Sequence, residues 1–228
     1  MKTFVIGDIH GAHKALVQCF ERSGFDGENH RLIALGDVCD GYPDVKECID
    51  ELLKIKHCEF IIGNHDLWTL NWATRGFREN IWLDQGGKNT IASYGTDGMP
   101  CKHIDFLKKA HLWFEFENQL FVHGGFDPDK PLVKQDLQTL VWDRELIEDA
   151  RRREMRGEKH RYTKFEDIFL GHTTTETFGS DKPLRFCNIW ALDTGAGWSG
   201  RLTIMDVHTK HYWQSDPVKS LYPGMKGR

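Results

Sequence analysis

Five stretches of the sequence end an apolar run in glycine and in side chains that can bind metals or transfer protons. They read FVIGDIHG, LIALGDVCDG, FIIGNHD, LFVHGG and IFLGHT. One such stretch alone would be interpreted as an ordinary turn, because Asn, Asp and Gly all favour turns. Five stretches with the same arrangement favour a shared site. Their polar residues are Asp8, His10, Asp37, Asp40, Asn64, His65, Asp66, His123 and His172.

The donor atoms in this set predict a metal site. Carboxylate, amide and imidazole donors together suit Mn, Fe or Zn better than Mg or Ca. Six protein donors exceed the about three that a single catalytic zinc keeps. Two metals about 3.5–4 Å apart that share a carboxylate would use them all. The six candidate ligands are Asp8, His10, Asp37, Asn64, His123 and His172.

The elements that must position these residues alternate between strand and helix. Apolar runs at 2–6, 31–35 and 60–62 predict strands. Apolar residues at helical spacing in 12–22, and again after Pro43, predict the helices between them. This order is typical of a parallel α/β sheet, in which ligands bind beyond the carboxyl ends of the strands. We therefore expect all five clusters at one rim, where Gly7, Gly36, Gly63 and Gly171 let the backbone turn from strand into ligand loop.

The remainder of the chain predicts a mixed architecture in one domain, 1–228. Residues 67–95 look helical and carry three tryptophans; 112–116 and 119–123 predict a hairpin; and 144–160 predict a charged helix. Strand-forming runs dominate the last third of the chain, including 185–192. No linker, repeat or low-complexity segment divides it.

Composition narrows the class of protein. A net charge of -4 over 228 residues argues against a general nucleic-acid binder, and no apolar run reaches the ~20 residues of a membrane helix. Six cysteines without a CxxC pair indicate a reducing compartment, so we expect a cytoplasmic protein. The basic run 151–153 is surrounded by acidic residues and is interpreted as a solvated helix face.

The motifs GDIHG, GDVCDG, GNHD, HGG and GHT, in this order, resemble those of the calcineurin-like metallophosphoesterases. The set is most similar to the phosphoprotein phosphatase branch, especially its small bacterial and phage serine/threonine phosphatases. The resemblance extends from Lys2 to about Gln214. It implies an α/β metallophosphoesterase sandwich, in which two mixed β-sheets pack face to face and are flanked by helices.

The resemblance also implies a role for each candidate residue. Asp8, His10 and Asp37 would hold one divalent metal, and Asp37 would bridge to a second, held by Asn64, His123 and His172. Manganese is expected, with iron or zinc as alternatives, and a water or hydroxide between the metals would be the nucleophile. His65 would protonate the leaving oxygen and Asp40 would orient it. Arg144 would grip the phosphate, the alternative being an exposed helix arginine in a salt bridge.

One position departs from the family pattern and leaves the substrate open. Gly41 stands where these phosphatases usually have a phosphate-binding arginine, and Arg75, Arg78 and Lys88 are the candidates to replace it, each with a surface charge as the alternative. The expected function is phosphate monoester hydrolysis, with phosphoserine and phosphothreonine proteins as the leading substrates. A dinucleoside polyphosphate hydrolase of the diadenosine tetraphosphate type is the alternative enzyme. An inactive binding module ranks lower, because its site would have lost ligands.

Overall fold

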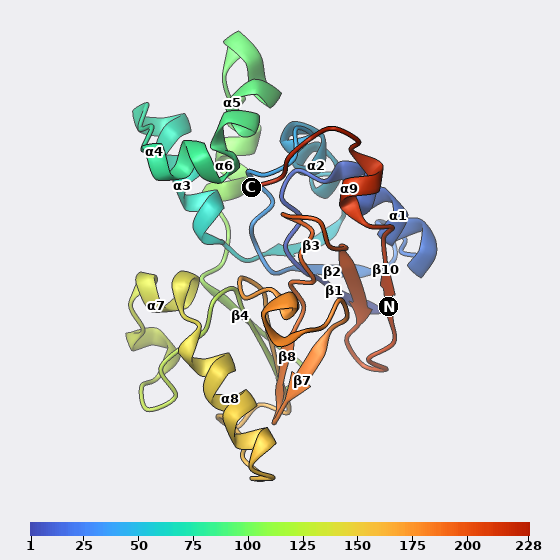
Figure 1. The fold of residues 1–228 in the computed structure, drawn as a ribbon, viewed down its shortest axis with the longest axis vertical. Coiled ribbons are helices and arrows are strands. Elements are labelled where there is room, and N and C mark those ends of the chain that lie inside the picture. The colour runs from blue at the N-terminus through green and yellow to red at the C-terminus, as the bar shows by residue number, and fades with distance from the viewer.

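The computed structural model describes all 228 residues, and its first sheet is built around the N-terminal strand. Strand β1 (Thr3–Ile6) pairs in parallel with β2 (Arg31–Ala34), which pairs in parallel with β3 (His57–Phe60). On its other side β1 pairs antiparallel with β9 (Thr203–Asp206), followed by β10 (Tyr212–Gln214). The order is β10-β9-β1-β2-β3, so strands from both ends of the sequence lie side by side (Figure 1).

The second sheet has the order β4-β5-β6-β8-β7. Its strands are β4 (Trp113–Phe116), β5 (Gln119–Val122), β6 (Asp167–Leu170), β7 (Leu184–Phe186) and β8 (Ile189–Ala191). The three inner strands are parallel, and the two edge strands pair antiparallel. The predicted hairpin of β4 and β5 turns at Glu117 and Asn118, whose φ values of 45° and 63° are those of a primed hairpin turn.

The two sheets pack face to face through one apolar cluster. Alternate residues of each strand point to this interface, as the two-residue period of a strand requires. Phe121 and Phe169 stack there with ring centroids 4.9 Å apart. The predicted sandwich of two mixed sheets is therefore confirmed. The cluster consists of Val5, Ile33, Leu35, Ile61, Phe121, Phe169, Leu192, Met205 and Val207.

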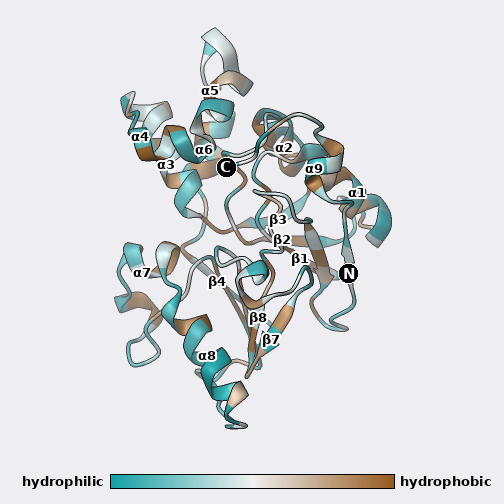
Figure 2. Ribbon diagram, viewed as in Figure 1, coloured by the Kyte–Doolittle hydropathy of each residue, from teal (hydrophilic) through white to brown (hydrophobic).

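Helices cover the outer faces of the sheets. Those beside the first sheet are α1 (His13–Ser23), α2 (Val45–Leu52), α3 (Asn64–Arg75), α4 (Asn80–Trp82), α5 (Lys88–Tyr94), α6 (Cys101–Lys108) and α9 (Val218–Leu221). A π-helical kink at Leu83–Gly87 joins α4 to α5. Helices α7 (Leu137–Trp142) and α8 (Glu145–Met155) lie against the second sheet. Figure 2 shows α8 mostly hydrophilic and the strands mostly hydrophobic. Short 3-10 turns occur at Gly95–Asp97, Leu132–Lys134 and Thr175–Phe178.

Three predicted elements differ in their bounds. The third strand ends at Phe60, because Ile61 instead forms a single bridge to His111. The expected strand 185–192 is a hairpin that reverses around Cys187, which has a φ of 54°. The charged helix stops at Met155, before Gly157 adopts a φ of 72°. None of the helices is both long and apolar enough to cross a membrane.

Candidate metal centre

All six candidate metal ligands are buried and follow strand ends at the same rim of the two sheets. Asp8 and His10 follow β1, Asp37 follows β2, and Asn64 opens α3 after β3. His123 follows β5 and His172 follows β6. The first sheet therefore supplies four of the six side chains and the second sheet supplies two.

Their donor atoms form two groups that share one carboxylate. Asp8, His10 and Asp37 form one group, while Asp37, His123 and His172 form the other, with the ligand atoms of each group within 4.8 Å of one another. Asp37 Oδ2 lies 3.7 Å from His10 Nε2 and 3.4 Å from His123 Nε2. Asn64 Oδ1 lies 3.1 Å from His123 Nε2, on the side of the second group.

Unpartnered atoms show that these residues fit cations. His10 Nε2, Asp37 Oδ2 and both ring nitrogens of His172 are buried without a hydrogen-bond partner. Buried polar atoms are costly unless they are paired or coordinate a metal. The far nitrogens of His10 and His123 are held by backbone carbonyls, with Nδ1 3.0 Å from Cys39 O and 2.7 Å from Leu35 O. Such contacts direct Nε2 toward a metal.

Without a bound cation, burial and mutual interactions strongly shift the pKa values of the carboxylates and imidazoles in this group. Burial, and then the charge of Asp193, raises the pKa of Asp8 well above its usual range. Burial opposes the charge of His123, yet Asp37 raises its pKa to about 9. Burial, followed by the charge of His123, lowers the pKa of His172 to about 2. A bound cation would relieve the crowding of buried carboxylates and use the neutral imidazole as a ligand.

Left-handed backbone conformations aim several of these side chains. His10, Asp37, Asp40 and His172 have φ values of 49°, 48°, 66° and 61°. Such values are uncommon outside glycine and cluster at functional sites.

The glycines of the same loops serve two different purposes. Among the four glycines expected to make the turns, Gly36 has a positive φ, of 99°, and fills that role. Gly7, Gly63 and Gly171 do not, so the expected reason is wrong for them. They are needed for close approach instead: a Cβ at Gly63 would lie 2.1 Å from Asp37 Oδ1, and one at Gly171 would lie 2.3 Å from Asp8 Oδ1.

His65 lies beside the metal group and is held by a carboxylate. Asp40 Oδ2 is 2.8 Å from His65 Nδ1, which places the Nδ1 proton between them. Asp40 also accepts hydrogen bonds from Trp82 Nε1 at 2.8 Å and Thr90 Oγ1 at 2.6 Å. The insert 67–95 therefore supports this pair, a role that the sequence did not predict. Burial raises the pKa of Asp40, and the interaction with His65 opposes that rise.

Asp66 binds backbone groups of two ligand loops. Its carboxylate accepts hydrogen bonds from the backbone N–H of Asp37 (2.7 Å), Val38 (3.0 Å), Cys39 (3.1 Å) and Gly63 (2.9 Å). Burial, and then the charge of Asp37, raises its pKa to about 7. Sequence reasoning noted Asp66 in the motif but gave it no role.

The expected phosphate-binding cations lie in different places. Arg144 is exposed at the start of α8 and forms no ion pair, so the salt-bridge alternative is not found. Partial burial, and then the charge of Arg228, lowers its pKa. Arg75 and Arg78 are exposed, and Lys88 pairs with Asp84 at 2.9 Å.

Arg228 is a site residue that the sequence did not reveal. Its Nη1 lies 2.6 Å from His65 Nε2 and 3.8 Å from Asp37 Oδ2. Because a guanidinium only donates hydrogen bonds, His65 Nε2 is the acceptor in this contact.

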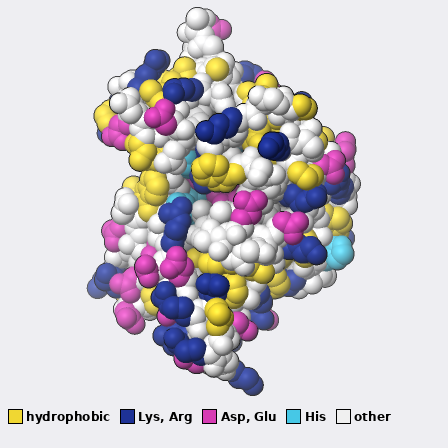
Figure 3. All heavy atoms as spheres, in the orientation of Figure 1, with side chains coloured by type: hydrophobic (Ala, Val, Ile, Leu, Met, Phe, Trp, Pro, Cys, Tyr) yellow, Lys and Arg dark blue, Asp and Glu magenta, His cyan; other side chains and the backbone are white.

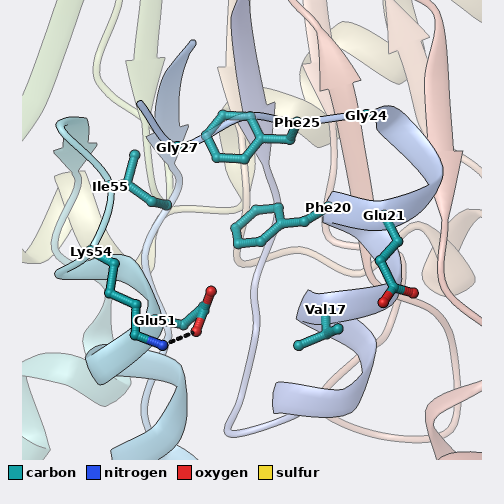
Figure 4. Close-up of a pocket in the computed structure, with 9 residues that line it drawn as sticks. All are labelled: Val17, Phe20, Glu21, Gly24, Phe25, Gly27, Glu51, Lys54 and Ile55. Carbon is teal, nitrogen blue, oxygen red and sulfur yellow. Dashed lines mark hydrogen bonds and ion pairs between the residues drawn. The ribbon is translucent and has the colours of Figure 1, made fainter. Parts of the chain in front are cut away.

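Figure 3 shows histidine side chains at the bottom of a hollow between the upper and lower parts of the molecule, with basic and hydrophobic side chains at its edge. A separate cavity of about 440 Å³ lies between α1 and α2. Figure 4 shows that Phe20, Phe25 and Ile55 line it together with the Glu51–Lys54 ion pair. None of the metal-binding candidates lines that cavity.

Comparisons with known proteins agree with this geometry. The model of the family described as Calcineurin-like phosphoesterase matches residues 1–194. "Serine/threonine-protein phosphatase 1" of Salmonella typhimurium is 26% identical, over 90% of this chain and 91% of the relative. "Bis(5'-nucleosyl)-tetraphosphatase, symmetrical" of Pseudomonas fluorescens is 23% identical, over 92% of each. The crystal structure of a putative diadenosine tetraphosphatase shares the fold, with a TM-score of 0.69 at 16% identity, covering 95% of this chain and 93% of that one. This chain therefore belongs to the calcineurin-like phosphoesterase family.

Proposed function

We propose that the protein hydrolyses phosphate monoesters with two divalent metal ions and that its substrates are phosphoserine and phosphothreonine in proteins. The observation that carries the proposal is the pairing of His65 with Asp40 at the edge of the six-ligand group. A metal site together with a carboxylate-oriented imidazole combines a centre that binds phosphate with a group that can transfer a proton.

Each residue contributes a distinct action. Asp8, His10 and Asp37 would hold one cation, with Asp37, Asn64, His123 and His172 around the other. Bound divalent cations, manganese above all, would supply an activated water and neutralise phosphate charge. His65 Nε2, which accepts a hydrogen bond from Arg228 in this structure, would first have to leave that contact and take up a proton; it would then donate this proton to the leaving oxygen, while Asp40 holds the opposite nitrogen. Arg144, exposed and unpaired, would bind the phosphate with its guanidinium fork.

A dinucleoside polyphosphate hydrolase is the second candidate, because an aromatic surface lies near the centre. Trp198 is 43% exposed and borders a cavity of about 460 Å³ together with Tyr42 and Arg228. An exposed indole can stack on a nucleobase. The similarity to the Pseudomonas fluorescens tetraphosphatase supports this alternative, and the similarity to the Salmonella typhimurium phosphatase supports the first.

Phosphate release from a phosphoserine peptide and from a dinucleoside tetraphosphate, measured in parallel with manganese-loaded protein, tests the proposal. We expect faster turnover of the peptide and loss of both activities with a chelator. Preference for the dinucleotide would select the second candidate. No turnover of either substrate by protein with two bound metals would refute both.

The role of His65 has its own test. His65→Asn should keep both metals and lose about 10²–10⁴-fold in turnover, the usual contribution of a general acid, with the largest loss on substrates that have poor leaving groups. His211→Asn, a change at an exposed histidine, is the control. Full activity of His65→Asn would remove the assigned role.

A further inference from the structure

We infer that Arg228 is a phosphate-binding residue of the metal centre and supplies the guanidinium that is missing at Gly41. The inference rests on the proposed function and names a residue for it. The segment that carries Arg228 arches from α9 past α2 toward α6, and its end lies at the centre of the molecule (Figure 1). Tyr42, Trp198 and Met225 line the same cavity as Arg228, so this segment is packed against the fold.

The contacts of Arg228 place its charge at the site. Its backbone N–H donates to Gly197 O at 2.9 Å, and its guanidinium carbon lies 5.1 Å from the centre of the Trp198 ring. Its side chain is 8% exposed. With Nη1 2.6 Å from His65 Nε2 and 3.8 Å from Asp37 Oδ2, the guanidinium touches the proposed proton donor and approaches the shared metal ligand.

Three glycines allow the close backbone approach that places Arg228 beside the metal ligands. Gly41 has a φ of 86°, and a Cβ on it would lie 3.0 Å from His10 Cβ. A Cβ on Gly197 would lie 2.5 Å from His10 Cδ2, and one on Gly227 would lie 2.2 Å from Gly197 O. The chain segment before Arg228 therefore packs against Gly197 and the ring of Tyr42, the residue that follows Gly41. The guanidinium thus reaches the site from the segment after α9 and not from the loop that contains Gly41.

The guanidinium has hydrogen-bonding capacity left for a ligand. Its Nε is buried and has no partner, and its Nη1 approaches the carboxylate of Asp37 only to 3.8 Å. A buried cation without a close anion is costly, and the planar fork of arginine fits phosphate oxygens. Arg144 lies close enough for the charge of Arg228 to lower its pKa.

Binding of inorganic phosphate to manganese-loaded protein, measured by calorimetry, tests the inference without requiring turnover. Arg228→Ala should weaken phosphate binding about ten- to a hundredfold, the worth of one or two hydrogen bonds to a charged group. Arg228→Lys should recover part of the affinity, because it keeps the charge and loses the fork. Lys226→Ala removes an exposed cation from the same segment and should leave binding unchanged.

Manganese stoichiometry and thermal unfolding of each variant separate loss of phosphate binding from loss of metals or of the fold. Unchanged phosphate affinity in Arg228→Ala, with two metals bound, would overturn the inference. Tighter phosphate binding or faster turnover would overturn it as well, because Arg228 would then obstruct the site. If the wild-type protein binds phosphate but hydrolyses neither substrate class, the proposed function fails and the effect of Arg228→Ala on phosphate binding still decides this inference.

Discussion

Asp66 shows how one side chain can hold two ligand loops together. It accepts hydrogen bonds from the backbone on both sides of the site, at Gly63 and at residues 37–39. These N–H groups are buried, and none of them donates a hydrogen bond to a backbone carbonyl of a helix or strand. The positions of Asp37 and Asn64 relative to each other therefore depend on a residue that need not touch a metal.

Replacing Asp66 should cost stability even in metal-free protein. We expect Asp66→Ala to lower the free energy of unfolding by about 2–4 kcal/mol, because it leaves several buried N–H groups unpaired. Urea unfolding in the presence of a chelator measures this directly. Asp105→Ala, at an exposed position of α6, is the matched control and should change stability little. Equal stability of the two variants would show that solvent satisfies the N–H groups.

At the residue scale, the sequence predicts those residues whose role is encoded locally. The six candidate ligands, His65 and Asp40 all lie near a glycine at the end of an apolar run, and the structure brings them together. Arg228 has no such signal, because its contact with His65 joins residues 163 positions apart. The same is true of Trp82, whose indole reaches Asp40 across 42 positions. Only tertiary packing reveals these two.

The turn between β3 and α3 leaves no room for a side chain at Gly63. Gly63→Ala should therefore lower stability by several kcal/mol, roughly the cost of overpacking a tight site, and weaken metal binding by displacing Asp37. Gly27→Ala is the control, because its Cβ would meet Ile55 at an ordinary 3.6 Å. Denaturant unfolding and manganese titration of both variants check this. Wild-type metal affinity in Gly63→Ala would show that the loop can move enough to accommodate the added methyl group.

The contact between α2 and α6 depends on a carboxylate. Asp50 of α2 receives hydrogen bonds from Lys102 and from His103 Nε2 (3.1 Å) of α6, and from Lys46 at 2.8 Å. These interactions, that with Lys102 first, hold the pKa of Asp50 well below its usual range. A carboxyl with a depressed pKa in the folded state stabilises the protein above its unfolded pKa, about 3.9. That stabilisation is lost as the pH falls toward the folded pKa.

Asp50→Asn should accordingly destabilise the protein at pH 7 by about 1–2 kcal/mol, the usual range for charged hydrogen bonds at a partly exposed site. The difference from wild type should shrink as the pH falls below about 4. Urea unfolding between pH 7 and pH 3 measures it. Glu47→Gln, at an exposed position of the same helix, should show no such dependence. A constant difference at every pH would mean that packing, and not charge, links α2 to α6.

Element types were predictable from periodicity, whereas their ends were not. Helix α1 buries Ala15, Leu16 and Cys19 at helical spacing, so its pattern is visible in the sequence. The hairpin of β7 and β8 was hidden in one apolar run, because its reversal uses Cys187 and Asn188 and no glycine or proline. A left-handed cysteine is not a turn signal that local propensity provides.

At the scale of the whole molecule, the packing interface between the two sheets determines whether the protein unfolds in one cooperative transition. Phe169→Ala removes one ring of the stacked pair and should cost about 3–5 kcal/mol, as for other buried aromatic truncations. Both sheets share this cluster, so we expect a single unfolding transition, with near-UV and far-UV dichroism changing together. Phe77→Ala, at a side chain that is 51% exposed, is the control. Two separate transitions in wild type would contradict the prediction of one domain.

The pairing of the sheets lies beyond what local patterns can predict. The order of alternating strands and helices predicts the parallel core of β1, β2 and β3. The antiparallel addition of β9 to β1 does not follow from it, since the two strands are separated by nearly the whole chain. The sandwich was predicted from the resemblance to a family, whereas periodicity alone would have predicted only one sheet.

The pairing of β1 with β9 has a consequence for biosynthesis. During translation β1 emerges well before β9, because Met205, the partner of Val5, follows it by 200 positions. Until then one edge of β1 has no strand to bind, and open strand edges recruit other chains. Arg228 follows later still. The first sheet, which carries four of the six candidate metal ligands, is thus complete only after β9 has emerged, and the edge of β1 stays open to other chains during that interval.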